Sequence, residues 1–275
     1  MYRGFVIFVV SLVVVLGAFW GFMTFGWPGN ANSCTYNVPN TCFCEAYDIN
    51  QVNSHAPGVR QFSNTWFNLY AIITALIVAI MVYRDRKHLS GMTQMNFMKS
   101  HSYVPDLYIF AVLFLGLGSM FFHASLTAWG GVVDGASMYV FAAFLVFYSI
   151  RRMIVSAWIF WLGYLVTVAL FTYLHTILAP LINIIILVTA YLIVEIIIWI
   201  RSGQILQGRT KTKWLWLSGV ASILTASFFW WASQTGHFLC YPNSLFQPHG
   251  MLWHPLAGVT AVLLYFYWRE ANDPV

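Results

Sequence analysis

The chain has 275 residues, of which 60% are hydrophobic and 8% are charged, and its mean hydropathy is +0.72. A soluble domain carries about 25% charged residues, so this composition excludes a soluble globular protein. The formal net charge of +5 is a signal of membrane orientation and does not indicate nucleic-acid binding.

Apolar runs of roughly 20 residues recur along the chain, each long enough to cross about 30 Å of hydrocarbon as a helix. The runs are continuously apolar and do not alternate, which favours helices over strands. The sequence therefore predicts an all-α integral membrane protein: a seven-transmembrane-helix bundle plus one extra N-terminal transmembrane helix. The eight predicted spans are about 4–27, 63–84, 106–126, 131–150, 154–174, 178–200, 213–233 and 251–268.

The first span, residues 1–27, is interpreted as an uncleaved signal anchor, with a cleaved signal peptide as the alternative. Residues 28–62 form an exported loop that contains cysteines, and residues 63–275 form the seven-helix core with a cytoplasmic C-terminus. With the N-terminus also in the cytoplasm, only Arg60 of the 13 Lys and Arg residues lies outside, as the positive-inside rule requires.

The four cysteines all fall in segments predicted to face outward, which favours disulfides. They allow three pairings. We favour Cys44–Cys240 with Cys34–Cys42, because the first bond would link the two long outer loops. A metal site at Cys42 and Cys44 is the alternative.

Ser119 and His123 are four residues apart on the third span, so they share one helix face near its outer end. A turn is expected at 129–131, and Asp134 then lies about one turn into the next, antiparallel span, at the depth of His123. His249 and His254 stand in the last outer loop and at the start of the final span, again at the outer level.

Three imidazoles with one open position are what a catalytic zinc ion needs. Asp134 would hold and deprotonate the attacking water, and Ser119 would donate to the oxyanion. Each residue taken singly has a plainer explanation: an interfacial histidine, an acid at a helix N-terminus, or a serine bonded to its own helix. Their common depth favours a site. Glu195 is interpreted as structural, and the histidines set aside for lack of such neighbours are His55, His88, His101, His175 and His237.

These residues resemble the alkaline ceramidase family, within the CREST superfamily of seven-helix membrane hydrolases and receptors. The resemblance is carried by Gly116-x-Gly118-Ser119-x-x-Phe122-His123-x-x-Leu126, Asp134 eleven residues after His123, and His249 to Trp253-His254. Asn64 to Asn68 and Cys44-Glu45 resemble the first core helix and the acidic outer loop of the family.

The resemblance implies hydrolysis of the amide of ceramide-like lipids to a fatty acid and a sphingoid base, with water as the second substrate. It implies zinc bound by His123, His249 and His254, and a Cys44–Cys240 bond between loops. A calcium ion held by acids of the outer loop is also implied, but only Glu45 matches and Asp48 is a second candidate. The oxygen ligands are otherwise replaced by Cys42, Tyr47 and Gln61.

Two alternatives remain open. The first is a zinc hydrolase that cleaves an acyl bond of another membrane lipid. The second is a non-catalytic receptor or sensor with structural zinc. The five-residue step from His249 to His254 departs from the four-residue step usual in the family. It rotates the second imidazole by about 140° on a regular helix, so an irregular turn is expected between Pro248 and Pro255.

Overall fold

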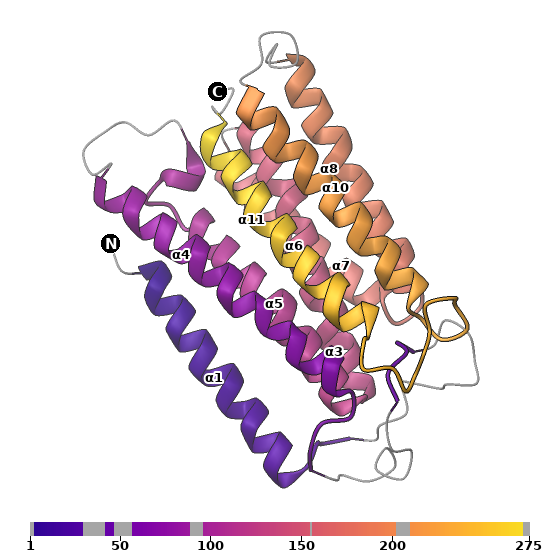
Figure 1. The fold of residues 1–275 in the computed structure, drawn as a ribbon. Helices are drawn as coiled ribbons and strands as arrows, with labels where there is room; N and C mark the ends of the chain where they lie inside the picture. The colour runs from indigo at the N-terminus through magenta and orange to yellow at the C-terminus, as the bar shows by residue number, and fades with distance from the viewer. Residues whose placement is uncertain are drawn as a thin grey trace.

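The computed structural model describes residues 3–29, 42–46, 57–88, 96–154, 156–201 and 210–271. Within these ranges, eight helices are long and apolar enough to cross a membrane. The predicted all-α membrane bundle is confirmed. In Figure 1 the helices run side by side along one common direction, and α1 begins at the same end of the bundle at which α11 ends.

The chain begins with α1 (Arg3–Phe25), which packs against α4 and α5. The second span is built from three pieces: α3 (Phe62–Trp66), the 3₁₀ turn η1 (Phe67–Leu69) and α4 (Tyr70–His88). A short 3₁₀ turn, η2 (Phe97–Lys99), leads into the next span. The remaining spans are α5 (Val104–Ser125), α6 (Ala128–Met153), α7 (Ala157–Leu174), α8 (Pro180–Arg201), α10 (Thr210–Ala232), and the π-helical turn η3 (His249–Trp253) with α11 (His254–Glu270).

Helices α5 and α6 form the centre of the bundle, and most of their residues are buried. Helix α6 packs against α7 and α8, while α11 packs against α10 and α4. In Figure 1, α1 lies at one edge of the bundle beside α4 and α5, and α11 lies between α4 and α10.

The turn between α5 and α6 occurs earlier than the sequence predicted. Leu126 adopts a left-handed conformation (φ 52°) and ends α5, with its N–H bonded to the Phe122 carbonyl. Thr127 then caps α6 by accepting a hydrogen bond from the Gly130 N–H at 3.1 Å. Asp134 consequently lies nearly two turns into α6, and not one.

Carboxylates of the described residues are paired with arginine toward the end of the bundle opposite to the three histidines. Asp106 binds Arg3 and Arg86, and Asp85 binds Arg269. Deeper in the bundle, fully buried Glu195 pairs with Arg152 at 3.2 Å and also accepts hydrogen bonds from Ser149, Tyr267 and Trp268. The last cluster joins α6, α8 and α11 and agrees with a structural role for Glu195.

Candidate metal centre and active site

Three histidines from distant parts of the chain meet at one end of the bundle. His123 lies in the last turns of α5, His249 begins η3, and His254 begins α11; all three are buried. One ring nitrogen from each lies within 4.8 Å of the others, and the Nε2 atoms of His123 and His249 are 3.2 Å apart. The group could hold a metal ion.

The five-residue step from His249 to His254 is accommodated by the π-helical turn. The His254 N–H donates to the His249 carbonyl, so residues five apart are aligned along the axis of η3. The two rings are therefore brought to a centroid distance of 4.6 Å. The expected irregular turn is present.

Gln61, at the start of α3, fixes the tautomer of His123. Its Nε2 donates to the Phe43 carbonyl at 2.8 Å, which orients the amide because a carbonyl only accepts. Its Oε1 lies 2.7 Å from His123 Nδ1, which must therefore carry the proton. The unprotonated Nε2 of His123 faces the other two histidines, as in metal sites whose histidine ligands donate their second N–H to an oxygen.

The imidazole nitrogens fit a zinc ion. Both ring nitrogens of His254 are buried without hydrogen-bond partners, although buried polar groups are normally paired. In a tetrahedral site with Zn–N bonds of 2.0–2.1 Å, two ligand nitrogens lie about 3.3 Å apart. The His123–His249 separation of 3.2 Å matches that edge.

Asp134 and Ser119 lie beside the histidines. Ser119 is buried one turn below His123, and half-buried Asp134 faces it from α6 within hydrogen-bonding reach. Both line a small polar pocket together with His249 and His254. The structure thus brings all five residues of the predicted zinc site to one place, although their chemical roles stay predictions.

The segment 42–46 covers this pocket. Cys44 is bonded to Cys240, so the favoured disulfide between these two loops is confirmed. Cys42 is also disulfide-bonded, which argues against a metal site at Cys42 and Cys44, and the described residues include no free cysteine. The predicted partner Cys34 lies outside the described residues. Phe43 stacks on the His249 ring with centroids 3.6 Å apart, so the disulfide-bonded segment holds an aromatic cover over the histidines.

The described residues of this loop do not form a calcium-binding set. Both carboxylate oxygens of Glu45 accept backbone N–H groups, from Ser63 at 2.5 Å and Asn64 at 2.8 Å, and so cap α3. Burial raises the pKa of Glu45, and these two hydrogen bonds oppose the rise. Gln61 donates an N–H to the Phe43 and Glu45 carbonyls. A calcium ion at this position would need an oxygen ligand in place of that N–H group. Asp48 lies outside the described residues.

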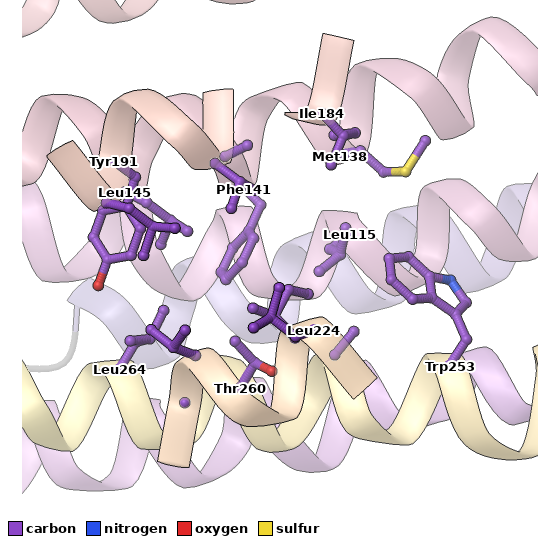
Figure 2. Close-up of a pocket in the computed structure, with 17 residues that line it drawn as sticks. Leu115, Met138, Phe141, Leu145, Ile184, Tyr191, Leu224, Trp253, Thr260 and Leu264 are labelled. Atoms are coloured by element: carbon purple, nitrogen blue, oxygen red, sulfur yellow. The ribbon is translucent and has the colours of Figure 1, made fainter. Parts of the chain in front are cut away.

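Two larger spaces adjoin the polar pocket. A vestibule of about 540 Å³ at the histidine end is lined by Asp134, Met138, Trp230 and His175, among others. An apolar pocket lies between α5, α6, α8, α10 and α11, and Figure 2 shows side chains such as Leu115, Phe141 and Leu264 converging on it. Met138 lines all three spaces.

Sequence reasoning missed three residues near the histidines: Gln61, Asn68 and His175. His175 was set aside as a loop histidine, yet Tyr139 OH lies 3.0 Å from its Nδ1, and a Cβ at Gly135 would lie 2.5 Å from its ring. Burial lowers the pKa of His175. The glycine next to Asp134 was the signal for this close approach, but nothing in the sequence indicated which side chain fills the space.

No protein-family model matches the chain, and no curated protein matches it. The resemblance to the alkaline ceramidases therefore stays a prediction that rests on the residues themselves.

Proposed function

We propose that this chain is a zinc-dependent membrane lipid amidase that hydrolyses the N-acyl bond of ceramide-like sphingolipids to a fatty acid and a sphingoid base. The observation that carries the proposal is the buried group of His123, His249 and His254 beside Asp134 and Ser119, at the mouth of an apolar pocket inside a membrane bundle. Buried polar groups at membrane depth are costly and are typical of functional sites.

His123, His249 and His254 would hold the zinc ion, which would supply Lewis acidity and lower the pKa of a bound water molecule. Asp134 accepts the proton of that water as general base. Ser119 directs its single O–H at Asp134 while the carboxylate is charged. Once Asp134 is protonated, the hydroxyl is free to turn and donate to the developing oxyanion.

The apolar pocket supports a lipid as the substrate. Tyr191 OH, one of its few polar atoms, already receives the Trp216 indole N–H, and Thr260 donates to the Leu256 carbonyl of its own helix. The pocket is therefore suited to an acyl chain. Its cavity volume is about 60 Å³, room for only a few water molecules, so a full acyl chain would need the pocket to widen.

We propose α8 and α10 as the pair that parts. Both line the pocket, and α8 packs on α6 whereas α10 packs on α11. The rings of Trp199 and Trp216 join the two helices toward their ends opposite to the histidines, with centroids 4.7 Å apart, and the Trp216 indole N–H donates to Tyr191 OH. Spreading the halves of the two helices nearer the histidines would open the pocket to the lipid bilayer.

The proposal is tested with detergent-purified protein, by metal analysis and by fatty-acid release from a panel of ceramides and ester lipids. We expect bound zinc and release from ceramides. His123→Ala should lose both zinc and activity, whereas Asp134→Asn should keep zinc and lose turnover. Thr225→Ala is the matched control, because its hydroxyl bonds only its own helix on an exposed surface.

Three outcomes would contradict the proposal in different ways. Zinc without release from any lipid would favour the receptor or sensor. Release from ester lipids alone would favour the other hydrolase. Full turnover by Asp134→Asn would remove Asp134 from the role of general base.

A further inference from the structure

Asn68 carries a buried acceptor that none of the described residues satisfies. It lies in η1, between α3 and α4, and its side chain is completely buried. Its Nδ2 donates to the Asn64 carbonyl at 2.8 Å, which fixes the orientation of the amide because a carbonyl only accepts. The other end, Oδ1, has no hydrogen-bond partner. Buried carbonyl oxygens are rarely left in this state unless a ligand completes them.

The position of Asn68 separates it from the other unpartnered oxygens. Ser63 Oγ and Asn64 Oδ1 lie against Gly250, where an added Cβ would meet them at 2.9 and 3.0 Å, so the chain itself fills that space. Asn183 Oδ1 is unpartnered but does not line the polar pocket. Among the described carboxamides whose oxygen lacks a partner, Asn68 is the one that lines the pocket.

Four other polar residues of that pocket already have roles in the proposed function. The imidazoles of His249 and His254 face the metal position, and Ser119 is directed at Asp134. Asn68 lines the same pocket, where the scissile bond must lie, and its Oδ1 is an unpartnered acceptor that remains for the substrate. An amide substrate offers one donor at that bond, its N–H, whereas an ester offers none.

We propose that Asn68 is a specificity-determining residue whose Oδ1 accepts the N–H of the scissile amide, so that the site prefers N-acyl lipids over O-acyl lipids. The inference rests on the proposed function for the identity of the reaction. Sites built to pair a substrate N–H or O–H reject analogues that lack it, because their own polar group is then left buried and unpaired.

The test compares a ceramide with a matched analogue in which an ester oxygen replaces the amide nitrogen. Asn68→Ala should lower kcat/KM for the amide about tenfold, a factor within the range of one hydrogen bond, and leave the ester rate nearly unchanged. Asn68→Ser serves as a second variant in case the alanine variant does not fold. Thr74→Val is the matched control on the neighbouring turns, because its hydroxyl bonds only the Tyr70 carbonyl.

A binding measurement separates this inference from the proposed function. In the Asp134→Asn background, which should hold lipid without turnover, the protein is expected to bind the amide more tightly than the ester, and Asn68→Ala should remove that preference. Wild-type protein that cleaves neither lipid would refute the proposed function, while an amide preference in binding that depends on Asn68 would still support the inference. Equal losses on amide and ester, in rate or in binding, would overturn it.

Discussion

Gln61 links the segment 42–46 to the cluster of three histidines through a single carboxamide. Its oxygen accepts a hydrogen bond from the His123 Nδ1–H, while its nitrogen donates to the carbonyls of Phe43 and Glu45. The backbone repeats the connection, since the Gln61 N–H donates to the His123 carbonyl. The side chain therefore sets both the direction of the His123 lone pair and the position of the segment that covers the pocket.

Replacing Gln61 should weaken the metal site without touching a ligand. Gln61→Leu removes the acceptor for His123 Nδ1–H, and loss of such a partner lowers metal affinity by roughly 10–100-fold. Chelator competition on the purified protein measures the change. Gln61→Glu is the informative comparison, because it keeps the acceptor and loses the donor to Phe43. It should retain zinc, and equal zinc affinity in Gln61→Leu and wild type would refute this role.

At the residue scale the sequence predicted the histidines, Asp134 and Ser119, because imidazoles, an acid and a hydroxyl stand out in apolar spans. It did not predict Gln61, Asn68 or His175. These residues come from loops or short turns, and their roles depend on which atom of a side chain is left without a partner. That property belongs to the folded packing and leaves no periodic pattern.

At the element scale, the π-helical turn η3 is the irregularity that assembles the site. The sequence predicted an irregular turn from the prolines at 248 and 255, but not its form. The i→i+5 hydrogen bond from the His254 N–H to the His249 carbonyl aligns residues five apart. An α-helix would align residues four apart instead.

The element can be tested by changing its length. Deleting Met251 should convert η3 to an ordinary α-helical turn and keep both imidazoles on one face, so zinc should be retained. Inserting one alanine after Met251 should rotate His254 by about 100° from His249 and abolish zinc binding. Metal content of the two purified variants is the measurement. Zinc retained after the insertion would show that the π turn does not set the geometry.

The extra N-terminal helix also acts on the site, although indirectly. Arg3 at its start is paired with Asp106, and Trp27 just beyond its end donates to the Gly58 carbonyl, three residues before Gln61. The Trp27 ring packs edge-on against Phe19 and Phe121. Helix α1 therefore stabilises the loop segment 58–61 that positions Gln61. The sequence alone did not indicate this contact.

For the whole molecule, the count and approximate limits of the spans were predictable because hydropathy is averaged over some 20 residues and tolerates local error. The pairing of carboxylates with arginine at the end opposite to the histidines was not predictable, because Asp85, Asp106 and Glu195 find partners on helices that are distant in sequence. These pairs explain how charged residues remain inside an apolar bundle.

The orientation predicted from the positive-inside rule is open to a direct test. Leu245, 93% exposed, lies in the loop at the histidine end, and Lys211, whose side chain is 72% exposed, lies at the opposite end. Single substitutions Leu245→Cys and Lys211→Cys place a thiol at each end, and the described residues contribute no free cysteine of their own. In intact cells or sealed vesicles of known orientation, a membrane-impermeant maleimide should label position 245 from the exported side and position 211 only after permeabilisation. The opposite pattern would place the metal centre on the cytoplasmic side and contradict the predicted orientation.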